Sequence, residues 1–181
     1  MSKRTVYRVA VVGGSGVGKT CLVNKLCYGT IPLQYEPTIE DLHTTILLTE
    51  KVEVIDTSTD SAAIVLRRAA MRAADIVMFV VDIQDITSIE RLPCHLHEYK
   101  QVCGSDNPGL VVGLARRRGP INLEAMEMAQ QIAELHGLEF TTSTLHRISI
   151  QSAFEKCVFL IEERRTTSPV PPATRNCCVI L

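Results

Sequence analysis

The chain has 181 residues, of which 46% are apolar and 22% are charged, and its formal net charge is −1. This length and composition are typical of one soluble globular domain with room for a hydrophobic core. The charge balance gives no reason to expect a nucleic-acid partner, and the longest apolar run, 76–81, is far too short to cross a membrane. Seven cysteines without a C-x-x-C spacing, and no signal-peptide pattern, indicate the reducing cytosol.

Strand-like and helix-like segments alternate along the chain. We predict strands at about 6–12, 44–48, 51–55, 76–81, 109–113 and 138–142, and helices at about 19–28, 62–73, 87–103, 122–136 and 147–164. Asn122 is the expected N-cap of the fourth helix, and Gly137 its expected end. Only Thr49-Glu50 separates the second and third strands, which predicts an antiparallel hairpin. The whole pattern predicts an α/β fold, with a six-stranded, mostly parallel sheet, one antiparallel edge strand and helices on both faces.

A phosphate-binding pattern, G-x-x-x-x-G-K-[ST], lies between the first strand and the first helix. Its eight residues are Gly13, Gly14, Ser15, Gly16, Val17, Gly18, Lys19 and Thr20. A glycine-rich turn at that place points backbone N–H groups and the helix N-terminus at phosphate oxygens. Lys19 can then reach the terminal phosphates, Thr20 can place its hydroxyl on Mg²⁺, and the following residue, Cys21, is a further nucleotide-binding candidate.

Two further motifs make the pattern specific. Tyr35-Glu36-Pro37-Thr38-Ile39-Glu40-Asp41 follows the first helix, and Asp56-Thr57 ends an apolar strand. With the phosphate loop, these residues resemble a Ras-superfamily small GTPase, closest to the Ras-like branch, over residues 5 to about 165. The resemblance implies a P-loop NTPase G domain that binds GTP or GDP with Mg²⁺.

The resemblance also assigns roles to individual residues. In the family, the residues matching Thr20, Thr38 and Asp56 hold the metal, and Thr38 also closes over the γ-phosphate. Residues 35–41 correspond to the first switch, which effector proteins read. The nucleotide contacts implied there are Tyr35 and Thr38, and the effector surface comprises Tyr35, Glu36, Pro37, Ile39, Glu40 and Asp41.

The second switch departs from the family pattern. Asp-x-x-Gly-Gln becomes Asp56-Thr57-Ser58-Thr59-Asp60. The missing glycine allows close approach of an N–H to the γ-phosphate, and the missing glutamine orients the attacking water in relatives. Asp60 is therefore only a weak catalytic candidate, better explained as a solvated loop residue, and we expect slow or absent hydrolysis.

The guanine pocket departs further. Where relatives carry Asn-Lys-x-Asp, this chain has Leu114-Ala115-Arg116-Arg117. Arginine has no acceptor for the guanine N–H groups, so we expect impaired guanine selectivity. Ser143 and Thr144 match a segment that contacts the base, and a backbone N–H remains available there in this interpretation. Arginines 116–118 suit phosphate or a partner's carboxylates, although we favour a solvated basic turn.

The last four residues, Cys178-Val179-Ile180-Leu181, match a prenylation box, and the final leucine favours geranylgeranyl. Residues 166–177 are rich in proline and small polar residues, which predicts a flexible tail after a G domain at 1–165. Stable anchoring usually takes a second lipid, and Cys177 is the candidate. We therefore expect a lipid-anchored protein at the cytoplasmic face of a membrane, the plasma membrane in the simplest case.

Three functions are open on this basis. The first is a monomeric Ras-like switch with impaired guanine selectivity and weak turnover, which engages effectors, exchange factors and GTPase-activating proteins. The second is a pseudo-GTPase scaffold that presents a fixed effector surface without nucleotide cycling. A phosphate-loop enzyme of another class, such as a nucleotide kinase, is disfavoured because the chain has no lid or acceptor-site sequence.

Overall fold

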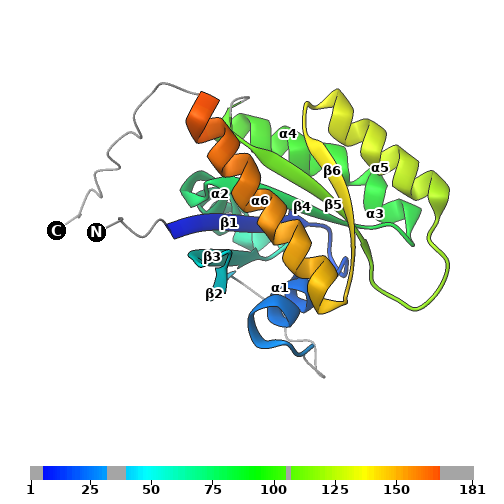
Figure 1. Ribbon diagram of the computed structural model, residues 1–181. Helices are drawn as coiled ribbons and strands as arrows, with labels where there is room; N and C mark the ends of the chain where they lie inside the picture. Colours follow the sequence, from blue (N-terminus) through cyan, green and yellow to red (C-terminus); the bar gives the residue numbers. More distant parts are fainter. Residues whose placement is uncertain (1–5, 32–39, 105–106, 168–181) are drawn as a thin grey trace, which may run out of the picture.

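The computed structural model describes residues 6–31, 40–104 and 107–167 (Figure 1). In chain order its elements are β1 (Val6–Gly13), α1 (Lys19–Tyr28), β2 (Glu40–Leu47), β3 (Glu50–Thr57), the 3₁₀ helix η1 (Ser61–Ala63), α2 (Ile64–Ala73), β4 (Ile76–Asp82), α3 (Ile86–Glu90), α4 (Leu92–Cys103), β5 (Gly109–Ala115), α5 (Leu123–Leu135), β6 (Glu139–Thr144) and α6 (Arg147–Thr167). None of the helices in this part of the chain is long and apolar enough to span a bilayer.

The strands form one sheet in the order β2-β3-β1-β4-β5-β6. All neighbours are parallel except β2 and β3, which pair antiparallel at one edge. This arrangement confirms the predicted α/β fold, including its single antiparallel edge strand. Because the parallel strands run in one direction, their carboxyl ends meet at one edge of the sheet, where ligands of such folds bind.

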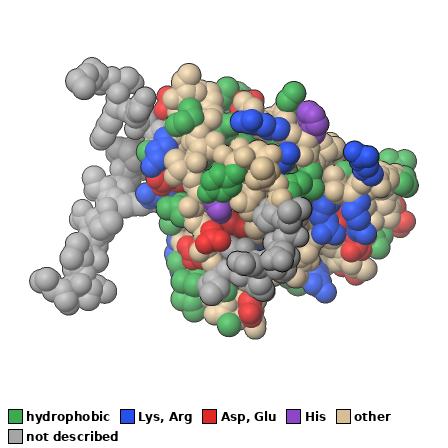
Figure 2. All heavy atoms as spheres, turned by 90° about the horizontal axis from the view of Figure 1, so that it is seen from below, with side chains coloured by type: hydrophobic (Ala, Val, Ile, Leu, Met, Phe, Trp, Pro, Cys, Tyr) green, Lys and Arg blue, Asp and Glu red, His purple; other side chains and the backbone are tan. Residues whose placement is uncertain are grey.

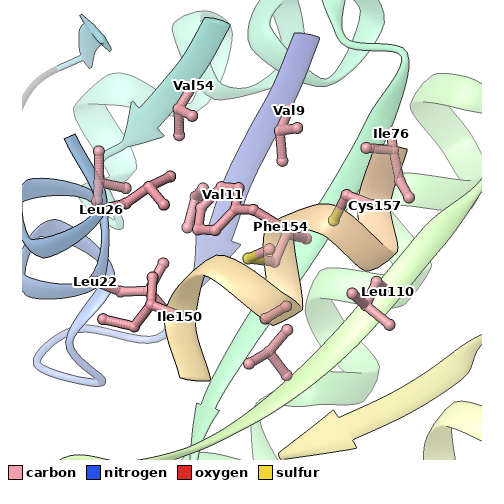
Figure 3. Close-up of a cluster of buried hydrophobic side chains, with 14 of the residues drawn as sticks. Val9, Val11, Leu22, Leu26, Val54, Ile76, Leu110, Ile150, Phe154 and Cys157 are labelled. Carbon is pink, nitrogen blue, oxygen red and sulfur yellow. The ribbon is translucent and has the colours of Figure 1, made fainter. Parts of the chain in front are cut away.

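Helices cover both faces of the sheet (Figure 1). On one face, α1 and α6 pack against β1, β4 and β5, and Figure 3 shows Leu22, Phe154 and Cys157 from the helices in one cluster with Val9 and Val11. On the other face lie α2, α3, α4 and α5. Every residue of β4 is buried, which explains the uninterrupted apolar run in the sequence.

The hairpin between β2 and β3 turns one residue earlier than predicted. Leu47 pairs with Glu50, so the loop is Leu48-Thr49. Both loop residues have positive φ, 49° and 70°, as a two-residue hairpin of this kind requires. Neither is glycine or asparagine, so the sequence carried no signal for the turn's position, and the β-branched Thr49 is strained in this conformation.

The single helix predicted at 87–103 is in fact two. Asp85 caps α3 by accepting a hydrogen bond from the backbone N–H of Thr87, and Arg91 separates α3 from α4. Pro93 lies in the first turn of α4. Proline is favoured there because that N–H has no helical partner, but it breaks a continuing helix. The other expected caps are confirmed, since Asn122 accepts from the N–H of Ala125 and Gly137 follows α5 with a φ of 71°.

Candidate functional site: a phosphate loop and an altered base region

The phosphate loop runs from the end of β1 into α1, at the carboxyl edge of the sheet. Gly13 must be glycine, because a Cβ atom there would collide with the backbone carbonyl of Val80 on β4. Gly18 caps α1 with a φ of 101°, a conformation that favours glycine. The loop therefore folds around backbone atoms, with its N–H groups at the helix N-terminus, as anion binding requires.

Lys19 lies folded over its own loop. Its Nζ donates to the carbonyl oxygens of Gly13, at 3.1 Å, and of Gly14, at 3.0 Å. The residue is only 8% exposed, and burial lowers the pKa of Lys19 to about 8. An ammonium held on two carbonyls at the loop's centre is placed to exchange them for phosphate oxygens.

Thr20 and Asp56 form the metal-binding half of the site. The Thr20 hydroxyl donates to Oδ2 of Asp56 at 2.6 Å. Asp56 is fully buried, and its Oδ1 is a buried acceptor with no hydrogen-bond partner among the described residues. Burial raises the pKa of the Asp56 carboxyl, while the Thr20 hydrogen bond opposes that shift. An orphaned carboxylate oxygen beside a hydroxyl fits a hard cation such as Mg²⁺, so the residues present are compatible with the group that the motifs imply.

Most of the predicted first switch lies outside the described residues, including Tyr35, Glu36, Pro37, Thr38 and Ile39. The last two predicted effector residues, Glu40 and Asp41, begin β2, where both are exposed and pair with Thr57 and Asp56 of β3. The start of β2 therefore joins the first switch directly to the strand that carries Asp56. The lipidation candidates Cys177 and Cys178 also lie outside the described residues.

The segment after Asp56 is held by hydrogen bonds within the chain. The Thr57 hydroxyl donates to the Val11 carbonyl at 2.8 Å. Asp60 is exposed and accepts from the N–H of Ala62, which makes it the N-cap of η1. Its carboxylate thus has a structural partner, in keeping with the interpretation of Asp60 as an exposed loop residue.

Arg67 of α2 holds the segment after Asp56 through a backbone carbonyl. It is 8% exposed, donates to the Ser58 carbonyl at 3.2 Å, and pairs with Glu98 of α4 at 3.1 Å. Removing one member of a buried ion pair typically costs about 3–5 kcal/mol. The sequence did not reveal this pair, because its partners are 31 residues apart and lie on different helices.

The region where relatives read the base is occupied by an ion cluster, which we name the Asp82 cluster: Asp82, Gln84, Arg116 and Arg117. Asp82, at the end of β4, is 2% exposed, and its Oδ2 lies 3.4 Å from Nε of Arg116 and 3.3 Å from a terminal nitrogen of Arg117. The expectation of a solvated basic turn holds for Arg117, whose side chain is 59% exposed, whereas Arg116 is half-buried beside Asp82. Arg118 is exposed, as expected.

Gln84 holds the backbone of the same loop. Its side-chain oxygen accepts from the Arg117 N–H at 2.7 Å, and its amide donates to the Arg117 carbonyl at 3.0 Å. The N–H of Gln84 in turn donates to Oδ1 of Asp82 at 2.9 Å. Arg117, at the position of the base-reading aspartate, is therefore fixed through its backbone, while its exposed side chain contacts Asp82. Asp82 was not singled out from the sequence; the one signal that could have drawn attention to it is its place as a carboxylate at the end of the apolar run of β4.

The second base-contacting segment is also internally satisfied. Ser143 is 2% exposed, and its hydroxyl lies 3.2 Å from that of Ser149. The backbone N–H of Thr144, which the resemblance offered to the base, donates instead to the Ser149 hydroxyl at 3.1 Å. Ser149, on α6, was not singled out from the sequence, because only the turn between β6 and α6 brings it to Thr144.

Comparison with known families agrees with this geometry. The sequence model of the Ras family matches residues 8–163. That range covers most of the chain and contains the phosphate loop, Asp56 and the Asp82 cluster. The chain belongs to the Ras family, and it is a small GTPase by fold and by family. Members of this family generally bind GTP or GDP with Mg²⁺ and interact with effectors, exchange factors and GTPase-activating proteins.

Proposed function

We propose that the protein is a membrane-anchored, Ras-like signalling protein that binds GTP and GDP with Mg²⁺, with impaired guanine selectivity and slow or absent hydrolysis. The observation that carries the proposal is the arrangement of Lys19, Thr20 and Asp56. A folded-back ammonium lies beside a hydroxyl–carboxylate pair whose buried Oδ1 has no partner within the described residues. Phosphate oxygens would pair with the Lys19 ammonium, and a divalent cation would pair with the Asp56 carboxylate.

Slow turnover is supported by the second switch. The position of the water-orienting glutamine holds Asp60, whose carboxylate caps η1. The position of the glycine before it holds Thr59, a β-branched residue. Because phosphoryl transfer depends on positioning the attacking water and stabilising charge, a loop with neither feature supplies little acceleration.

Membrane anchoring is supported by the sequence of the C-terminus. Cys178 begins the prenylation box, and Cys177 offers a second lipid site. Effector binding through residues 35–41 rests on the completeness of that motif. These features support the proposal of a signalling role at the cytoplasmic face of a membrane, with the plasma membrane as the proposed site.

A second candidate function, a pseudo-GTPase scaffold, is favoured by the base region. Arg117 is tied to Asp82 and Gln84, and the Thr144 N–H is tied to Ser149. A site without free base-reading groups binds nucleotide more weakly, and a scaffold would need none. The two functions differ in whether the loop binds nucleotide in Mg²⁺.

The test is a titration of the purified protein with fluorescent GDP and GTP in Mg²⁺. The proposed function predicts saturable binding that Lys19→Ala abolishes, because the ammonium at the centre of the loop is lost. Lys100→Ala, which removes an exposed lysine on α4, is the matched control and should bind as the wild type does. Equal binding by Lys19→Ala and wild type would contradict the proposal, and no binding by either would favour the scaffold.

A further inference from the structure

Arg116 lies against the phosphate loop. Its Cδ would be 3.0 Å from a Cβ atom placed on Gly18, so its aliphatic stem covers the residue that caps α1. It also lines a polar cleft of about 270 Å³ with Gly14, Ser15 and Gly16. Burial raises the pKa of the Cys21 thiol and the Arg116 guanidinium opposes that shift, which places this charge near the first turn of α1.

The hydrogen-bonding capacity of Arg116 is largely unused. Its Nε is buried and, although it lies 3.4 Å from Asp82, makes no hydrogen bond among the described residues. Arginine carries five N–H donors. The buried Nε is unsatisfied at a cost of about 1–3 kcal/mol, and an incoming acceptor would be bound by the terminal N–H groups of the one-third exposed side chain.

The residues that line the cleft include two guanidiniums, from Arg91 and Arg116, and two carboxylates, from Asp82 and Asp85. Asp85 is already engaged by the N–H and hydroxyl of Thr87. Figure 2 shows Lys and Arg interspersed with Asp and Glu on one face of the protein. Because Asp82 is shared between Arg116 and Arg117 and Asp85 is engaged by Thr87, Arg116 keeps donors for a further acceptor.

The altered base region offers few groups that could read a base. The Arg117 backbone is held by Gln84, its exposed guanidinium has no acceptor for the guanine N–H groups, and the Thr144 N–H is held by Ser149. Selection among bases rests on polar groups that are left unpaired with the wrong base. Groups paired within the protein discriminate little.

We propose that Arg116 binds the phosphate chain held by the loop, and that the site accepts nucleoside di- and triphosphates without selecting the base. This inference rests on the proposed function, since it requires that the loop binds nucleotide. It goes further because it gives Arg116, a residue of the altered base region, the role of binding phosphate. The ligand class is then an oligophosphate whose nucleoside is not recognised.

The experiment measures competition against fluorescent GDP, in Mg²⁺, by GDP, ADP, UDP and inorganic tripolyphosphate. For the wild type we expect the three nucleotides to compete within about threefold of one another, since base contacts worth even 1.4 kcal/mol would separate them tenfold. Tripolyphosphate should compete as well. A preference for GDP over ADP of about a hundredfold or more would overturn the inference while leaving the proposed function intact.

Variants test the role of Arg116 itself. Arg116→Met keeps an aliphatic side chain over Gly18 but removes the guanidinium. It should weaken the binding of all four competitors about tenfold or more, because a charge-assisted hydrogen bond is lost. Arg118→Met removes an exposed arginine two residues away and should leave them unchanged. Arg116→Lys should recover part of the affinity, because it restores the charge without the planar fork.

Thermal unfolding of each variant without ligand separates binding from folding. Equal weakening of all competitors at an unchanged melting temperature supports phosphate binding by Arg116. Unchanged affinity in Arg116→Met overturns it, and so does a loss confined to GDP. Failure of the wild type to bind any of the four ligands would remove the proposed nucleotide-binding function together with this inference.

Discussion

At the scale of single residues, Asp56 shows a conflict between stability and binding. A buried carboxylate with one oxygen unpaired among the described residues is costly in the absence of a cation. Its raised pKa has the same origin, since burial disfavours the charged form. Functional sites commonly carry such local costs because the ligand offsets them.

Asp56→Asn should therefore separate the two properties. The amide oxygen still accepts from Thr20, and the buried charge is gone, so we expect the nucleotide-free protein to gain about 0.5–2 kcal/mol in its free energy of unfolding. Binding of GDP should lose its dependence on Mg²⁺. Chemical denaturation and a Mg²⁺ titration measure the two effects, and a destabilised variant would argue against an uncompensated charge.

The residues of the phosphate loop could be predicted because their pattern is local. Eight consecutive residues define its conformation, and in the structure Lys19 folds back onto the loop carbonyls while Thr20 donates to Asp56. The Asp82 cluster could not be predicted from the sequence. The contact between Asp82 and Arg117 joins residues 35 apart and depends on β4 and β5 being neighbours. The same holds for Thr144 and Ser149, which meet through the turn into α6.

At the scale of secondary-structure elements, the strongly periodic or continuously apolar segments were predicted well, and the boundaries less so. The mostly parallel sheet with helices on both faces follows from the alternation of strands and helices, whereas the order of the strands comes from the structure. The hairpin turn and the break before Pro93 were misjudged for different reasons. The turn lacks glycine and asparagine, whereas the proline signal was present but was outweighed by the apolar pattern on both sides.

The strained hairpin turn leads to a stability prediction. Replacing Leu48-Thr49 by Asn-Gly supplies residues that favour positive φ at both positions. We expect a gain of about 1 kcal/mol, or roughly 2–4 °C in the melting temperature of a domain of this size.

Thr44→Gly is the matched control, since it places a glycine in the middle of β2, where it should destabilise. Differential scanning calorimetry measures both variants. A lower melting temperature for the Asn-Gly variant would mean that Leu48-Thr49 is not the turn.

At the scale of the whole molecule, the parts of the site lie on one edge of the sheet, while α6 ends at Thr167, towards the opposite end of the molecule from the phosphate loop (Figure 1). A lipid on the segment after α6 would therefore leave the nucleotide edge away from the attachment point. This arrangement suits a tethered domain whose site remains accessible to partners.

Anchoring is tested in cells. Cys178→Ser removes the prenyl acceptor and should move the protein from the membrane to the soluble fraction, because each buried CH₂ of the lipid contributes about 0.8 kcal/mol. Cys177→Ser should weaken membrane association only in part, because it removes the second lipid and leaves the first. Cys94→Ser, at an exposed cysteine of α4, should have no effect, and membrane association that survives Cys178→Ser would rule out prenyl anchoring.

The central claim is that this phosphate loop binds nucleotide despite its altered base region. Its most direct test is to denature the freshly purified, full-length protein and identify any released nucleotide by chromatography. The account predicts a nucleoside di- or triphosphate close to one per protein molecule, and its absence from Lys19→Ala. A wild-type protein that releases none, and takes up none when supplied with Mg²⁺ and high micromolar GDP or ADP, would contradict the account.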